Sequence, residues 1–134
     1  MNYDSMGGLM VRVFTASEAI PLMGVVVNVT GADEENFDIA KSALTDDNGI
    51  TPVIRLPAPN VRYSLSYDPN ERPYATYDVT LIIDGYYTKR ILGVQLFSDI
   101  VASLPVEMLP YVSNENGGRY PRYNNAILFD EVEK

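Results

Sequence analysis

The chain has 134 residues, of which 46% are hydrophobic, and a formal net charge of −8 from 18 acidic and 10 basic residues. This length suits one domain with a packed core, and the negative charge disfavours nucleic acid and anionic membrane surfaces as partners. The chain contains no histidine and no cysteine. That composition removes the usual general base near neutral pH, the commonest metal ligand and all thiol chemistry.

The distribution of apolar residues disfavours two further classes of protein, those that span a membrane and those that carry a secretory leader. No apolar run approaches the ~20 residues of a membrane-spanning helix, so we expect no membrane insertion. Residues 1–8 carry neither the basic residue nor the apolar run of a secretory leader. We therefore expect no signal peptide.

Short apolar stretches rich in β-branched residues alternate with turn residues along the chain, which predicts strands. A helix over 34–44 is an alternative to the third strand, because its apolar residues have helical spacing. No other helical crossover is recognisable, so the pattern predicts an all-β fold, a seven-stranded Greek-key sandwich. Strands are expected at 9–14, 25–30, from 37 or 40 to 45, 53–56, 77–83, 87–97 and 101–109.

Turn residues separate these predicted strands. Pro21 and Gly24 are expected to make the first turn, and Gly49 follows Asn48 at a second one. Gly85 lets the chain reverse before the strand at 87–97, and Gly93 within that strand indicates a β-bulge. The acidic stretch 33–35 is interpreted as a solvated loop.

Composition also divides the chain into three parts. Residues 1–7 are expected to form a flexible N-terminus, and 8–110 form the sandwich domain. After Pro110 the sequence becomes rich in Asn, Gly, Tyr and Arg without periodicity. Residues 111–134 are therefore interpreted as a C-terminal tail or a surface-packed extension.

Several of these motifs together resemble a known pattern. The strand at 8–13 is followed by Pro21-Leu22-Met23-Gly24-Val25-Val26-Val27, then by Thr45-Asp46-Asp47-Asn48-Gly49, and later by Tyr77-Asp78-Val79-Thr80-Leu81 with Gly85-Tyr86-Tyr87. This arrangement resembles the carboxypeptidase regulatory-like group, which has a transthyretin-like (prealbumin-like) sandwich. The resemblance covers 8–110 and implies a fold rather than a function, because its motifs are turns and core strands.

A narrower likeness concerns four further stretches, 56–59, 73–79, 93–97 and 104–110. They are similar to small domains of spore cortex-lytic or peptidoglycan-associated proteins in clostridia-like bacteria. The likeness implies a cytoplasmic or spore-associated location and a cell-wall glycan or a protein as partner. No lytic module is recognisable in this sequence, so the likeness does not carry lytic activity over.

The remaining polar residues show no pattern typical of a catalytic or metal site. No acid–base pair stands at a meaningful spacing, so we expect no enzyme activity, no cofactor and no metal. Asp46 to Gly49 clusters oxygen donors but lacks the donor spacing of a calcium loop, and a plain turn is preferred. A Lys–Asn crosslink is not expected either, because the first strand carries Arg12 where that chemistry needs lysine.

Two groups of residues remain as candidate contact sites. Tyr74, Tyr86 and Tyr87 fall in loop or turn positions and could form an exposed contact patch, the alternative being that they are half-buried. In the tail, Ile127, Leu128 and Phe129 form an apolar segment that either packs on its own domain or pairs with a neighbouring chain.

These residues support two hypotheses. The first is a non-catalytic binding or scaffolding module of the spore or cell envelope. The second is a structural subunit of a coat, appendage or phage-like particle that self-associates through its tail.

Overall fold

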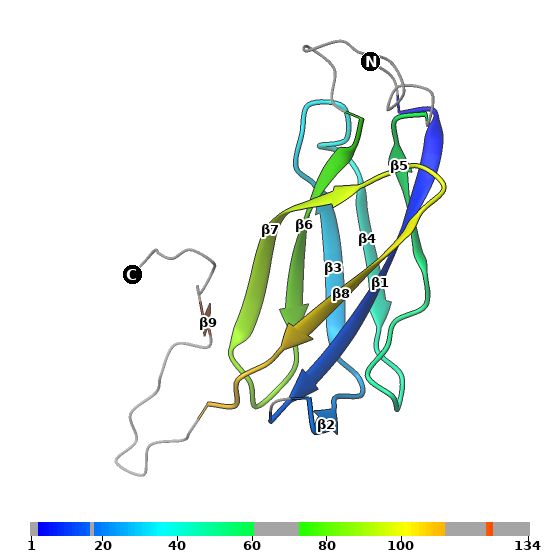
Figure 1. Cartoon of the computed structure of the whole chain (residues 1–134). Helices are drawn as coiled ribbons and strands as arrows, with labels where there is room; N and C mark the ends of the chain where they lie inside the picture. Colours follow the sequence, from blue (N-terminus) through cyan, green and yellow to red (C-terminus); the bar gives the residue numbers. More distant parts are fainter. Residues whose placement is uncertain (1–2, 17, 61–72, 112–122, 125–134) are drawn as a thin grey trace.

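The computed structural model describes residues 3–16, 18–60, 73–111 and 123–124, and over these residues the chain forms two β-sheets and no helix (Figure 1). The all-β sandwich expected from the sequence is confirmed, with seven strands of at least five residues and two strands of two residues. In chain order they are β1 (Ser5–Thr15), β2 (Ile20–Pro21), β3 (Val26–Gly31), β4 (Ala40–Leu44), β5 (Ile54–Ala58), β6 (Ala75–Ile82), β7 (Thr88–Leu96), β8 (Val101–Glu107) and β9 (Tyr123–Asn124).

The first sheet is built around β1. It pairs with β2 and β5 in antiparallel fashion and with β8 in parallel fashion. Gly8 pairs with both β5 and β8, and Phe14 pairs with both β2 and β8. Because a strand has only two edges, β2 and β5 share one edge of β1, and β8 occupies the other.

The second sheet has the order β4-β3-β6-β7-β9. Its first four strands are antiparallel, and β9 adds to β7 in parallel. The register between β6 and β7 shifts, so that Val79 faces Ile91 while Tyr77 faces Val94. Gly93 lies inside this bulge with a φ of 74°. The bulge predicted at Gly93 is thereby confirmed, because glycine adopts this backbone conformation at little cost.

The core lies between the two sheets and follows the alternation of strand side chains. The first sheet contributes alternate residues of β1 and β5, and the second contributes alternate residues of β3 and β6. The fully buried large side chains are Leu9, Val11, Val13, Val25, Val27, Val29, Leu56, Tyr77, Val79, Leu81, Leu96 and Met108.

Buried threonines satisfy backbone groups at the strand ends. Thr45 Oγ1 accepts from the Val25 amide and donates to the Leu22 carbonyl, at 2.9 and 2.7 Å. Thr15 Oγ1 donates to the Met108 carbonyl at 2.8 Å. These bonds matter because a buried backbone group without a partner costs about 1–3 kcal/mol.

The strand expected from 37 or 40 to 45 is confirmed as β4, and its helix alternative is wrong. The helix alternative over 34–44 does not form: residues 34–38 make turns and Ala40–Leu44 is β4. The residues whose spacing suggested a helical face are not buried: Phe37 is 77% exposed, and Ala40, Lys41 and Leu44 are exposed as well.

The N-terminus was also misjudged, because β1 starts at Ser5 rather than Gly8 and its first residues pair with β5. Gly7 lets this part of β1 lie close to the segment that follows β7, since a Cβ atom at that position would lie 2.5 Å from the Phe97 carbonyl oxygen. The described part of the chain contains no helix long and apolar enough to cross a membrane.

Candidate functional site

The outer edge of β7 is the best candidate for a contact site. One side of β7 pairs with β6 along most of its length. On its other side the described partner is β9, which pairs only with Thr88 and Lys89 (Figure 1). Within the described residues, positions 90–96 therefore present backbone groups with no neighbouring strand. Such an edge is a template on which another strand can add.

Two of the predicted tyrosines, Tyr86 and Tyr87, lie at the start of this edge. The turn at Asp84-Gly85 precedes them, and Gly85 has a φ of 91°. The amide of Tyr87 donates to the Leu109 carbonyl at 2.9 Å, which ties the chain after β8 to the start of β7.

Tyr111 joins this pair of tyrosines, although the sequence analysis assigned it to the tail. Its amide donates to the Gly85 carbonyl at 3.2 Å, and its ring packs edge-on against Tyr87 with 5.9 Å between centroids. All three tyrosines are half-buried, and Tyr86 packs against the core. Tyr87 and Tyr111 thus form a ring pair. Tyr86 precedes Tyr87 and forms a backbone bridge with Pro110 at the same end of the sandwich, and we call these three residues the tyrosine cluster.

Tyr74 does not belong to this cluster. It precedes β6, whereas Tyr86 and Tyr87 follow it, and an eight-residue strand separates them by roughly 25 Å. The ring of Tyr74 lies 5.6 Å from that of Phe97, at the opposite end of the sandwich. The structure therefore brings together two of the three predicted tyrosines. Ile127, Leu128 and Phe129 lie outside the described residues, and their predicted role remains a prediction.

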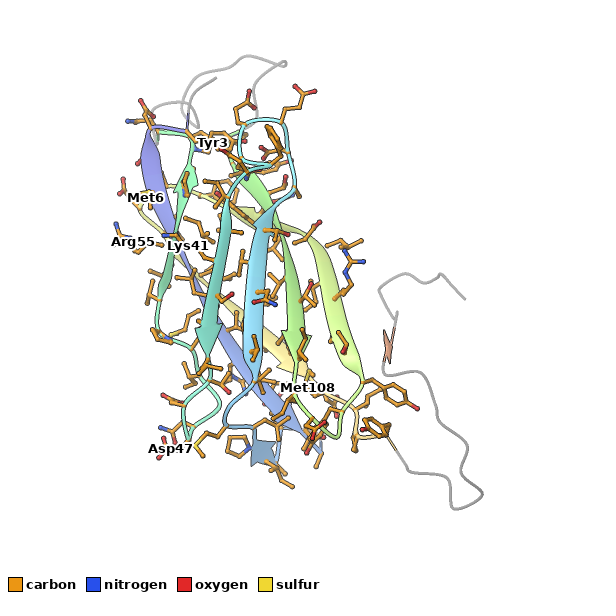
Figure 2. All side chains as sticks on the ribbon, turned by 180° about the vertical axis from the view of Figure 1, so that it is seen from behind. Tyr3, Met6, Lys41, Asp47, Arg55 and Met108 are labelled. Atoms are coloured by element: carbon orange, nitrogen blue, oxygen red, sulfur yellow. The ribbon has the colours of Figure 1, made fainter. Side chains whose placement is uncertain are left out.

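A second polar cluster surrounds Asp33, which the sequence analysis placed in a solvated loop. Figure 2 shows Tyr3 beside the loop between β3 and β4. Asp33 Oδ2 accepts from the Tyr3 hydroxyl at 2.8 Å and from the Thr76 amide at 3.0 Å, and Oδ1 accepts from the Glu35 amide at 3.0 Å. Burial alone would raise the pKa of Asp33, but these hydrogen bonds outweigh it and lower the pKa below its usual value.

Asn36 extends this cluster into the core. Its side chain is fully buried, donates to the Thr76 carbonyl at 3.0 Å and accepts from the Asp33 amide at 2.9 Å. Nearby, the Tyr77 hydroxyl donates to the Pro57 carbonyl at 2.6 Å. Burial raises the pKa of Tyr77 to about 12. All these groups bond inward, so the cluster fastens the two sheets and the N-terminal strand. An aspartate three residues before an asparagine is a turn signal that could have indicated it.

No protein-family model matches the chain, and no curated protein matches its sequence. Solved structures match at low identity. The catechol 1,2-dioxygenase of Acinetobacter sp. ADP1 is 14% identical over 95% of this chain and 57% of that chain, with a TM-score of 0.53. The catechol 1,2-dioxygenase of Pseudomonas arvilla C-1 is 15% identical over 90% of this chain and 58% of that chain, with a TM-score of 0.52.

The TIE protein of Bacillus anthracis is a further match, 20% identical over 80% of this chain and 17% of that chain, with a TM-score of 0.51. The chain spans less than two thirds of the length of each of these proteins. At these identities the likeness shows the fold alone, a β-sandwich. The transthyretin-like and spore-related parts of the resemblance remain predictions.

Within the described residues, no three side chains of His, Cys, Asp or Glu are grouped to hold a metal ion. At the turn considered for calcium, Asp46 Oδ1 accepts from the amides of Asn48 and Ile50, both at 2.9 Å. One carboxylate oxygen is thereby used to close the turn.

Proposed function

We propose that this chain is a non-catalytic binding or scaffolding module, and that the outer edge of β7 accepts a strand from another polypeptide chain. The observation that carries the proposal is the pairing of β9 with Thr88 and Lys89 while residues 90–96 keep an open edge among the described residues. Addition of a strand to an exposed sheet edge is a recurring mode of peptide recognition, in which backbone hydrogen bonds supply affinity.

Other edges of the sandwich are less suited to this role. On β4, Lys41 Nζ reaches across to the carbonyl of Arg55 on β5 at 2.8 Å and so bridges the gap between the two sheets (Figure 2). On β8, Pro105 lacks the amide that a pairing strand would need. The edge of β7 carries no proline.

The non-catalytic part of the proposal rests on composition and on the bonding of the acidic groups. The chain has no histidine or cysteine. The carboxylate oxygens of Asp33, whose pKa is lowered, accept hydrogen bonds from backbone amides and from hydroxyl groups. These features support binding to another molecule, rather than catalysis, as the function of the chain.

The proposal is tested with a chain that ends at Tyr111 and a labelled peptide of residues 123–129. The buried apolar cluster of the described residues lies between Leu9 and Met108, so this shorter chain retains it. Its melting curve checks that it folds. We expect saturable binding of the peptide and none of a scrambled one. Leu92→Lys should weaken binding, whereas Leu44→Lys, at an equally exposed leucine on β4, should not. Equal effects of the two substitutions would contradict the assignment to β7.

Self-assembly is a second candidate function, and the pairing of β9 with β7 favours it, because the same pairing between copies would join them. Sedimentation of the full chain at increasing concentration tests this version. Growth in mass that Leu92→Lys suppresses would support it, and a strictly monomeric species at high concentration would remove it.

We further propose a spore or cell-envelope setting and a transthyretin-like kinship, both supported by the motif resemblance alone. Retention on purified peptidoglycan is the relevant measurement for the setting. Retention no greater than that of an unrelated acidic protein would argue against it.

A further inference from the structure

The outer face of the first sheet, which is turned away from the core, has a hollow at Gly8. Gly8 pairs with Arg55 on β5 on one side and with Val101 on β8 on the other. Because Gly8 has no side chain, it forms the floor of a hollow of about 230 Å³. A Cβ atom at Gly8 would lie 2.9 Å from Val53 Cγ1 and 3.2 Å from Val101 Cγ2. The two valine side chains therefore lie on either side of this floor.

Apolar side chains surround this hollow and are accessible to solvent. Val53, Ile100 and Val101 leave 43%, 56% and 53% of their surface exposed, and Met6 and Met10 on β1 are half-buried. The middle of the outer face of the second sheet is polar by comparison, with Asn28, Thr30, Ser42, Asp78 and Thr80. Exposed apolar side chains gathered on one face are typical of a contact surface.

Charges of opposite sign lie on the two sides of the hollow. Arg55 lies on β5 beside Met6 of β1 (Figure 2), and Lys41 adds a second positive charge there, since its Nζ donates to the Arg55 carbonyl. Asp99 lies in the turn before β8, where its amide donates to the Met6 carbonyl at 2.9 Å. Within the described residues, the exposed side chains of Arg55 and Asp99 take part in no hydrogen bond or ion pair. The face is thus positive at β5, apolar in the middle and negative beside β8.

This arrangement of charges is complementary to itself. We propose that a second copy of this chain docks on the face, with the two copies related by a two-fold axis parallel to β1. Such an axis places β5 of each copy over β8 of the other, so that Arg55 of each copy faces Asp99 of the other. A two-fold axis across the strands would instead set β5 against β5 and bring like charges together. Met6 and Met10 flank the hollow along β1, and their unbranched side chains can fill it from both copies.

The inference is independent of the proposed function, because the edge of β7 belongs to the other sheet. The two-fold pairing closes on itself and joins two copies only. Three strands about 4.8 Å apart make a narrow face, smaller than the roughly 800 Å² per partner of a stable complex, so we expect association at about 100 µM and above. The net charge of −8 on each copy adds repulsion, which physiological salt screens beyond about 8 Å.

Charge reversal tests this inference, with sedimentation of the full chain in physiological salt as the measurement. We expect the wild type to approach twice the monomer mass as its concentration rises, and R55D and D99R each to need a concentration at least roughly tenfold higher. Mixed in equal amounts, the two variants should associate as the wild type does, because both ion pairs of the mixed dimer are attractive. R90D and D38R reverse exposed charges elsewhere, change the net charge by the same amounts, and should associate as the wild type does.

A second variant of Asp99 guards against a folding defect. Asp99 has a φ of 63°, which aspartate and asparagine tolerate better than arginine does, so D99N removes the charge while keeping a suitable residue. D99N should also weaken association, and melting curves check that each variant folds. A wild type that stays monomeric at about 1 mM, well above the range expected for a small interface, would overturn the inference. A mixture of R55D and D99R that associates no better than either variant alone would overturn it as well.

Leu92→Lys separates this face from the edge of β7. Association that L92K leaves unchanged supports the dimer on the first sheet, whereas association that L92K suppresses belongs to the edge of β7 and overturns the assignment to this face. The proposed function fails separately, when the peptide of residues 123–129 does not bind the chain ending at Tyr111.

Discussion

The hydroxyl of Tyr77 on β6 donates a hydrogen bond to the carbonyl oxygen of Pro57 on β5, at 2.6 Å. β6 belongs to one sheet and β5 to the other, so a single side chain joins the two layers through the core. Its ring is fully buried. The bond adds a directional contact to the apolar, non-directional packing between the sheets.

Replacing Tyr77 by phenylalanine should remove this bond while keeping the ring in place. We expect the free energy of unfolding to fall by about 1 kcal/mol, the usual net contribution of a hydrogen bond in a protein. Urea unfolding measures it. Y86F is the matched control, because the half-buried ring of Tyr86 takes no part in the bond between the sheets. A variant Y77F as stable as the wild type would show that the bond to Pro57 contributes nothing.

Tyr77 also predicts how stability changes in alkali. Its pKa is raised to about 12 in the folded chain, from 10.0 in the absence of burial. The folded state therefore keeps a proton that the unfolded state releases above pH 10. Stability present below pH 10 should decline as the pH rises toward 12, by about 2 kcal/mol at pH 12. Unfolding measured across this range should show a smaller decline in Y77F than in the wild type. Parallel curves for the two proteins would contradict the prediction.

Asp33 makes the opposite prediction in acid. Partial burial would raise the pKa of Asp33, but hydrogen bonds from Thr76, Tyr3 and Glu35 hold this pKa below its ordinary value of 3.8. Its contribution to stability is thus present above pH 3.8 and is lost as the pH falls through the folded pKa. D33N should lower stability at neutral pH by about 1–3 kcal/mol and flatten the acid decline. D38N, at an exposed position of the same loop, is the control and should keep the wild-type profile.

Much of the fold could be predicted from local patterns. The alternation of Tyr77, Val79 and Leu81 indicated β6, and the structure buries all three. Gly49 was placed correctly at a turn, where it has a φ of 77°. These features could be predicted because a strand alternates apolar and polar residues along the sequence, and because a positive φ favours glycine.

Contacts between segments that are distant in the sequence could not be predicted from local patterns. Gly7 was expected in a flexible N-terminus, whereas it lies in β1, which runs close to the chain around Phe97. Tyr74 was grouped with Tyr86 because both fall in loop or turn positions, yet they lie at opposite ends of β6. Tyr111 was missed because its neighbours have no periodicity. Only the three-dimensional arrangement decides which loops meet.

Gly31 gives a last prediction, because it ends β3 directly beside the cluster around Asp33. A Cβ atom at Gly31 would overlap the backbone carbonyl of Asn36 and would lie 2.6 Å from Asn36 Oδ1. Backbone cannot move aside as a flexible side chain can, and Asn36 is itself fixed by bonds to Asp33 and Thr76. G31A should therefore cost about 2–3 kcal/mol, as overpacking of a filled site does.

The exposed neighbour Thr30 provides the control for this substitution. T30A changes a residue of the same strand without entering the Asn36 site, so its unfolding free energy should stay close to that of the wild type. NMR spectra of G31A should show shifted amide signals at Asp33 and Thr76, because both bond to the displaced Asn36 or share its cluster. A stable G31A chain with unchanged signals at those residues would mean that the loop between β3 and β4 yields freely and does not fasten the sheets.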